Sequence, residues 1–295
     1  MTPALEAEGL GKRYGRARAL QRCSIGIPPG RIGALVGPNG AGKTTLLHLA
    51  VGLLRPTEGS IRVLGWEPRA EPQLVLSRIG FVAQDVPLYR GYSVADLLHL
   101  GRSLNRRWDE AVALSRLRDL DIPLDRPAGR LSAGQRAQVA LAMALAKRPE
   151  LLLLDEPLAS LDPLARRRFL QELMRAATED GLTVLLSSHL VTELERVCDY
   201  LVILRDGRVR LAGDLEGLLA EHWLLVGPSQ AQRSRPDGME VVMASETERQ
   251  LMLWARGEPP AGEGWQATRL SLEDLVLAYL GGAERPGPAM EAVGA

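Results

Sequence analysis

The sequence predicts an α/β fold in which a parallel sheet is buried between helices and a group of helices is inserted between two of its strands. Two runs, LLLLD at 151–155 and TVLLSS at 183–188, are almost continuously apolar. Such runs are typical of strands that are covered on both faces of a parallel sheet. From about residue 85 to residue 148 the pattern is helical instead. Strands that alternate with helices favour an α/β core, and the long helical stretch predicts a helical subdomain within it.

The first third of the chain contains short strands. In CSIGI at 23–27 apolar residues alternate with smaller ones, and the alternation repeats at 61–63 after the turn PTEGS. RIGALVG at 31–37 predicts a further strand, which leads through a glycine-rich turn into an apolar helix from Leu46 to Leu54. This order of strand, loop and helix is the context in which many nucleotide sites are built.

Capping signals predict where several helices begin. Ser93 and Asp96 have the spacing of a capping box ahead of a leucine-rich segment. Asp162 is a favourable N-cap, and Pro163 follows it at the first helical position. The Ala- and Leu-rich stretch 134–147 predicts another helix, which a proline ends two residues later.

We expect the first domain of the chain to span 1–222, with the helical subdomain at about 85–148, and a small α+β appendage to span 223–280. Asp206–Gly207, between LVILR and RVRLAG, predicts a two-residue hairpin at the end of the first part. The last residues, 281–295, are rich in Gly, Pro and Ala, and we expect them to be disordered. Within the appendage we expect a loop at 227–238, strands at 240–245 and 250–255, a helix from Ser271 to about Leu280, and packing roles for Trp223, Trp254 and Trp265.

The composition excludes some function classes. The 295 residues carry 36 basic and 36 acidic side chains, so the net charge gives no sign of a nucleic-acid partner. Cys23 and Cys198 lack metal-ligand spacing, which favours two buried thiols in a reducing compartment. The longest apolar runs, such as 139–146, are far shorter than the roughly 20 residues of a membrane span. No secretory leader opens the sequence, so we expect a cytoplasmic chain that does not cross a bilayer by itself.

The strongest local motif is GPNGAGKTT, which stands directly between a predicted strand and a predicted helix. Glycines allow backbone N–H groups to converge on phosphate oxygens, and the N-terminus of the helix favours the negative charge. The motif therefore predicts a phosphate-binding loop rather than a tight turn with an incidental lysine. Its residues are Gly37, Pro38, Asn39, Gly40, Ala41, Gly42, Lys43, which reaches the outer phosphates, Thr44, which is placed to ligate Mg²⁺, and Thr45.

A second motif is LLLLDEP at 151–157, in which two adjacent carboxylates follow the apolar run. A carboxylate at the end of a buried strand is costly unless it serves a cation or a hydrogen-bond network. We therefore expect Asp155 to hold the Mg²⁺ shell and Glu156 to accept a proton from an attacking water. Read alone, the pair could instead cap the following turn. Together with the phosphate-binding loop it indicates a P-loop nucleotidase.

LSAGQ at 131–135 lies at the start of the Ala-rich helix, and with it the chain closely resembles the ATP-binding cassette (ABC) ATPases. The match covers roughly residues 4–222, with the motifs in the family's order. Ala133 replaces the usual second glycine of the signature motif, whereas Gly134 is retained. The resemblance implies a RecA-like P-loop NTPase core with an antiparallel β subdomain and a helical subdomain.

The resemblance also assigns roles to residues that would mean little alone. Tyr14 matches the aromatic residue that stacks on adenine, although a tyrosine is more often plain packing. Gln84 matches the glutamine that senses Mg²⁺ and the attacking water and contacts the membrane partner. His189 matches the switch histidine at the γ-phosphate. The segment 160–162 resembles a loop that communicates between subunits, although Asp162 can equally be only a helix cap.

The family's geometry implies a dimer and defines the candidate site. Two cassettes pair head to tail, and each ATP lies between one phosphate loop and the signature motif of the other copy. We thus expect a homodimer that binds ATP and Mg²⁺. The candidate residues are Glu156, His189, Lys43 and Gln84 for catalysis, Thr44, Gln84 and Asp155 for the metal, and Tyr14, the loop 37–45, Ser132, Gly134 and Gln135 for the nucleotide.

Two functions remain open at this point. The phrases PTEGSIRVLG, IGFVAQDVPLY and LASLDPLARRRF look most like bacterial exporter cassettes of the antibiotic, drug or lipid type. That reading places the chain on the inner face of the membrane, bound to a separate polytopic subunit near Gln84 and Leu88–Tyr89. The alternative is a soluble ABC ATPase that acts on DNA or the ribosome. Such relatives carry a long coiled-coil insert or tandem cassettes, and this chain has neither.

Overall fold

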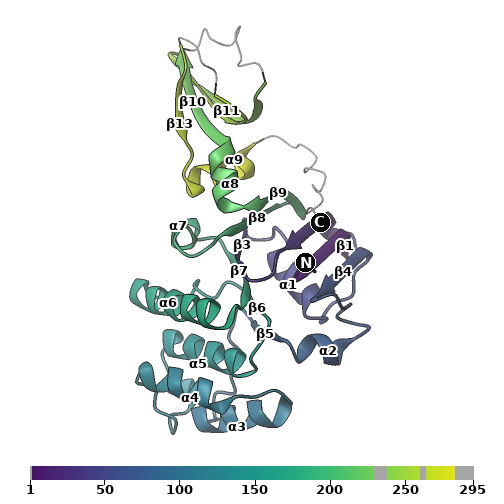
Figure 1. The fold of residues 1–295 in the computed structure, drawn as a ribbon, viewed down its shortest axis with the longest axis vertical. Helices are drawn as coiled ribbons and strands as arrows, with labels where there is room; N and C mark the ends of the chain where they lie inside the picture. Colours follow the sequence, from purple (N-terminus) through teal and green to yellow (C-terminus); the bar gives the residue numbers. More distant parts are fainter. Residues whose placement is uncertain (1, 229–237, 260–263, 283–295) are drawn as a thin grey trace.

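The computed structural model describes residues 2–228, 238–259 and 264–282, and three sheets with helices around them make up this part of the chain (Figure 1). A six-stranded sheet has the order β5-β6-β7-β3-β8-β9, with all neighbours parallel except the hairpin of β8 and β9. Its strands are β3 (Ile32–Val36), β5 (Ile79–Val82), β6 (Leu151–Leu154), β7 (Thr183–Ser188), β8 (Tyr200–Arg205) and β9 (Arg208–Asp214). The predicted parallel strands and the hairpin at Asp206–Gly207 are confirmed.

Strand β6 shows how the sheet is buried on both faces. Leu151 and Leu153 belong to one hydrophobic core, whereas Leu152 and Leu154 belong to the other, and all four are fully buried. The first core lies toward α1 (Lys43–Ala50) and a three-stranded antiparallel sheet of order β2-β1-β4. The second lies toward α5 (Ala133–Ala146) and α6 (Pro163–Asp180). The small sheet consists of β1 (Leu5–Tyr14), β2 (Ala17–Ile27) and β4 (Glu58–Val63).

The helices between β5 and β6 have a core of their own, built around Leu97, Leu98 and Leu117. The capping box of Ser93 and Asp96 forms as predicted. Arg116 joins this group to α6 through an ion pair with Glu172, with 2.8 Å between Nη1 and Oε2. The elements are α3 (Val94–Leu104), α4 (Glu110–Asp119), the 3-10 turn η1 (Ala128–Arg130) and α5, while α2 (Pro72–Leu76) precedes β5.

The C-terminal residues form a four-stranded antiparallel sheet of order β11-β12-β10-β13, at the top of Figure 1. The predicted strands at 240–245 and 250–255 and the helix after Ser271 are confirmed. Three further elements were not anticipated: α8, β10 and β13. The bounds are α8 (Leu215–Glu221), β10 (His222–Pro228), β11 (Glu240–Glu246), β12 (Gln250–Arg256), β13 (Gln266–Arg269) and α9 (Leu272–Gly281).

The structure changes the bounds of one expected loop and one expected helix, and parts of the expected loop and tail lie outside the described residues. The expected loop at 227–238 begins later, because Gly227 and Pro228 still pair with β12. Residues 229–237 and the expected disordered tail from 283 onward lie outside the described parts. The predicted helix at 46–54 runs instead from Lys43 to Ala50, since the glycine at 42 already starts it.

Several smaller expectations are confirmed. Cys23 and Cys198 are buried free thiols. Trp223 and Trp265 pack on the core of the C-terminal sheet, and Trp254 packs on the main core. Within the described ranges, no helix is both long enough and apolar enough to span a bilayer.

Candidate active site

The glycines of the 37–45 loop let the backbone pack where no side chain would fit. A Cβ on Gly37 would lie 2.1 Å from the carbonyl oxygen of Leu204 in β8. Gly42 has a φ of 108°, and a Cβ there would lie 2.6 Å from the carbonyl oxygen of Ala19. The loop is therefore pressed between β8 and β2 immediately before α1 begins, and the backbone N–H groups at the start of that helix are left for an anion.

A pocket of about 430 Å³ lies at this loop. It brings together the loop residues and two residues from other strands that the sequence motifs had singled out, Gln84 after β5 and Glu156 after β6. Ala19 also lines it, and no motif pointed to that residue. The described lining consists of Ala19, Asn39, Gly40, Ala41, Gly42, Lys43, Thr44, Thr45, Gln84 and Glu156.

Glu156 contacts two other predicted residues, Lys43, which also lines the pocket, and His189, which does not. The Nζ atom of Lys43 lies 3.0 Å from Oε1 of Glu156, and Nδ1 of His189 lies 2.8 Å from Oε2. Lys43 also donates to the carbonyl oxygen of Gly37 at 2.7 Å. The side chains of Lys43 and Glu156 are 6% and 7% exposed, so the pair is nearly dry. In such a place opposite charges attract strongly, so Lys43 is well placed to hold a phosphate.

Ser187 organises both carboxylates, and sequence reasoning missed it. Its hydroxyl donates to Oδ1 of Asp155 at 2.8 Å and accepts from the backbone N–H of Glu156 at 2.8 Å. Glu156 has a φ of 46°, a left-handed conformation that is strained for a side chain of this kind. The hydrogen bond from its own N–H helps to hold that conformation. The signal available in the sequence was a pair of serines at the end of the apolar run TVLLSS.

The donor set here suits a magnesium ion. Thr44 and Gln84, which carry a hydroxyl and an amide oxygen, line the pocket, and Asp155 is the buried carboxylate next in sequence to Glu156. Oxygen donors of this kind, few in number and combined with substrate phosphates, are the ligands that Mg²⁺ takes in phosphoryl-transfer sites. Within the described residues, no group of three or more His, Cys, Asp or Glu side chains could by itself hold a metal ion.

Eight of the predicted residues do not line this pocket: Tyr14, Gly37, Pro38, Ser132, Gly134, Gln135, Asp155 and His189. Tyr14, at the end of β1, is 49% exposed, and the Nζ atom of Lys12 stands 5.3 Å from its ring centre. Ser132, Gly134 and Gln135 lie at the start of α5 and do not line the pocket. Ser132 and Gln135 form a reciprocal capping box there, so the motif also serves its own helix.

Comparison with known proteins agrees with this geometry. Residues 20–159 match the family model described as ABC transporter. Over 299 residues the chain is 35% identical to the Nod factor export ATP-binding protein I of Sinorhizobium fredii, which covers 94% of this chain and 86% of that protein.

Two solved structures are similar over most of their length. One is cbiO1 from Clostridium perfringens, described as part of the ABC transporter complex cbiONQ, with a TM-score of 0.65, 30% identity and coverage of 75% of this chain and 92% of that one. The other is the dimeric structure of MJ0796, a bacterial ABC transporter cassette, with a TM-score of 0.64, 26% identity and coverage of 72% and 98%. The phosphate-binding loop, the carboxylates that face it and these relatives together show that the chain belongs to the ABC transporter family as an ATP-binding and ATP-hydrolysing subunit.

Proposed function

We propose that this subunit powers export through a separate membrane subunit, and that ATP occupancy is communicated to that subunit along α1 and the segment after β5. The observation that carries the proposal is that these two elements each line two pockets. Lys43 and Thr44, at the start of α1, line the phosphate pocket, while His48, in its last turn, lines a second pocket. Gln84 lines the first and Ala83 the second.

The residue roles follow from their positions. Lys43 would bind the outer phosphates once a nucleotide replaces its contact with Glu156. Glu156, released from Lys43, would accept the proton of the attacking water, and His189 would orient that carboxylate through the contact at Oε2. Asp155, Thr44 and Gln84 would hold Mg²⁺, which supplies neutralisation of the phosphate charge when bound. Tyr14, exposed at the end of β1, would stack on adenine.

A second copy of the chain would complete each site. Ser132, Gly134 and Gln135 do not line the phosphate pocket of their own chain, and we propose that they contact the nucleotide bound by a second copy. Ser132 is exposed at the start of α5, where the first N–H groups of the helix are available to a phosphate. The similar cassette MJ0796 is described as dimeric, which supports a head-to-tail dimer with ATP at the interface.

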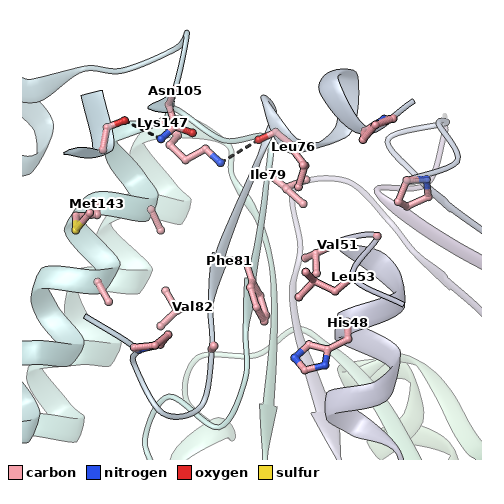
Figure 2. A pocket seen from close by; sticks show the side chains of 18 of the residues that line it. His48, Val51, Leu53, Leu76, Ile79, Phe81, Val82, Asn105, Met143 and Lys147 are labelled. Atoms are coloured by element: carbon pink, nitrogen blue, oxygen red, sulfur yellow. Dashed lines mark hydrogen bonds between the residues drawn. The ribbon is translucent and has the colours of Figure 1, made fainter. Parts of the chain in front are cut away.

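The second pocket is the proposed docking site for the membrane subunit (Figure 2). It measures about 770 Å³ and lies between α1 and β5 on one side and α3 and α5 on the other. Figure 2 shows Met143 on one wall, His48 and Val51 on the opposite wall and Phe81 between them. Leu53 and Leu76 at the pocket are 63% and 45% exposed. An apolar hollow with exposed leucines at its rim fits an apolar segment of a partner better than it fits solvent.

The wall of this pocket is tied across the two groups of elements. Lys147, after α5, donates to the carbonyl oxygen of Leu76 at 2.9 Å, and burial lowers the pKa of its ammonium group. The rings of His48 and Phe81 meet edge to face with 6.0 Å between their centres. A partner segment bound in this pocket would therefore be displaced when α1 or α5 moves.

Export is supported by the Nod factor export protein, which matches along nearly the whole chain. The cargo would be set by the membrane subunit. The alternative, an ATPase that acts on DNA or the ribosome, has no observation in its favour, whereas the apolar docking pocket favours a membrane partner. A membrane subunit docked in this pocket would hold the chain at the inner face of the membrane.

The docking proposal is tested by detergent extraction and purification of the tagged full chain, followed by identification of the bound protein. We expect a polytopic membrane protein with the unmodified chain and with Leu164→Glu, a control at a leucine of α6 that is 59% exposed. Leu76→Glu should lose that protein and retain the ATPase activity of the chain alone. Recovery of ribosomal proteins or DNA in place of the membrane protein would contradict the proposal.

A further inference from the structure

The C-terminal helix α9 is part of the main hydrophobic core, although it follows the separate C-terminal sheet. Leu272, Leu275 and Val276 are fully buried and belong to the same core as the large sheet. The helix packs against β8, β11 and α7 (Val191–Leu194). By contrast, Leu277 of the same helix is 54% exposed, so only one face of α9 is used.

The contact with α7 is close to the chemistry. Helix α7 begins two residues after His189, whose ring is 2.8 Å from Glu156. Leu194 of α7 is fully buried in the core that contains Leu275. The side chain of His189 is 44% exposed, and its Nδ1 atom contacts Glu156. The position of His189 therefore depends on the element that packs against α7, which is α9.

The other end of α9 is tied to the strand that backs the phosphate loop. The Nη1 atom of Arg205, the last residue of β8, donates to the carbonyl oxygen of Gly282 at 2.8 Å. The neighbouring Leu204 presents its carbonyl oxygen to Gly37, and the N–H of Gly207 donates to the carbonyl oxygen of Ala41 at 3.1 Å. Helix α9 thus contacts both α7, which follows His189, and β8, which packs against the loop that contains Lys43.

We propose that α9 is a positioning element for ATP hydrolysis. It holds α7, and with it His189, in register with the phosphate loop, so Leu275 acts on turnover through His189 without touching the nucleotide, while Arg205 ties the end of the helix to β8. This inference rests on the proposed role of His189. It also gives the C-terminal appendage a role, because α9 follows the strands β10 to β13 in the chain.

The test compares Leu275→Ala with Leu277→Ala, a matched leucine truncation on the exposed face of the same helix. We expect Leu275→Ala to lower kcat between about 3- and 30-fold, the range in which supporting contacts modulate a distant site. The Kd for ADP should change less than about twofold, because Lys43 and its loop remain in place. Leu277→Ala should match the wild type, and the volume-conserving Leu275→Met should restore turnover.

A double-variant cycle separates positioning from general destabilisation. In a His189→Ala background, Leu275→Ala should cause little further loss, because the group that it positions is already absent. An equal loss in both backgrounds would overturn the proposal.

A readout that does not need turnover keeps this test apart from that of the proposed function. Amide hydrogen exchange at 189–194 in the nucleotide-free chain should be faster in Leu275→Ala than in Leu277→Ala. Equal protection in the two variants would refute the role of α9 whether or not the chain hydrolyses ATP. Absence of wild-type turnover, by contrast, would be a failure of the proposed function and would appear before any variant is compared.

Discussion

At the scale of single residues, the site contains an internal ion pair. Lys43 and Glu156 are both nearly buried, with 3.0 Å between Nζ and Oε1. A charge that is removed from water needs a partner, so each side chain makes the burial of the other tolerable. Because ATP brings its own negative charge, it can replace Glu156 as the partner of Lys43 and release the carboxylate for catalysis.

Removal of the lysine should therefore destabilise the empty protein. Lys43→Met leaves the Glu156 carboxylate buried without its lysine partner, and we expect a loss of roughly 3 kcal/mol in the free energy of unfolding. Glu156→Gln keeps an oxygen for the lysine and should cost less. Urea titration of the nucleotide-free variants measures both. Lys43→Met with wild-type stability would show that the pair is not formed in solution.

The sequence predicts those parts of the site that are local along the chain. The nine residues of the phosphate-binding loop are contiguous, and the structure brings that loop together with Gln84 and Glu156 as expected. Ser187 was missed because its contacts with Asp155 and Glu156 join residues 32 and 31 positions apart. They exist only because β6 and β7 are parallel neighbours. The functional roles of all these residues stay predictions.

At the scale of elements, too, features that depend on residues close in sequence were predictable, whereas features that depend on distant pairing were not. The starts of α3, α5, α6 and α9 were predictable because each depends on a serine or aspartate that caps the helix within three residues. Strands β10 and β13 were not. All four side chains of β13 are exposed, so it has no apolar alternation, and β10 becomes a strand only by pairing with β12 and β13 on its two sides.

The junction of α8 and β10 carries a buried histidine that should make stability depend on pH. His222 is fully buried, its Nδ1 atom lies 2.6 Å from the carbonyl oxygen of Leu218, and its Nε2 atom lies 2.9 Å from the hydroxyl of Tyr279. Burial lowers the pKa of this imidazole in the folded chain, with Glu221, Glu240 and Arg256 acting as weaker influences. The folded state therefore favours the neutral ring.

The sign of the pH effect follows from that shift. Below about pH 6.5 the unfolded chain protonates this histidine while the folded chain does not, so the unfolded state binds more protons. The free energy of unfolding should fall as pH falls through this window and stop falling below the lowered pKa. His222→Gln should show a shallower fall than the wild type in urea titrations between about pH 7.5 and about pH 5. Parallel profiles would contradict the assignment.

At the scale of the whole molecule, one chain carries two halves of a site that do not meet. Lys43 lies in the phosphate pocket and Ser132 lies outside it, on a different group of helices. The docking pocket lies between these two groups, and it is lined by α1 from one and by α5 from the other. A partner that closes the ATP site from outside would therefore change the same groove in which the proposed membrane subunit sits.

This arrangement predicts that two inactive variants can restore each other. Lys43→Ala loses the phosphate contact, and Ser132→Arg blocks the exposed start of α5 for a partner while costing about 1 kcal/mol through the lost helix cap. Each variant alone should be inactive, because every site in its dimer is defective. In a mixed dimer, the intact Lys43 of one copy faces the intact Ser132 of the other, so one site in two is whole.

With equal mixing and random pairing, half of the dimers are mixed, and turnover should return to about one quarter of the wild-type rate. ATP hydrolysis measured across a series of mixing ratios gives the decisive curve, which should peak at equal amounts. The double variant Lys43→Ala/Ser132→Arg is the control, because mixing it with Lys43→Ala restores no complete site. Ser132→Arg that hydrolyses ATP at the wild-type rate alone would show that one chain suffices, and the head-to-tail site would be wrong.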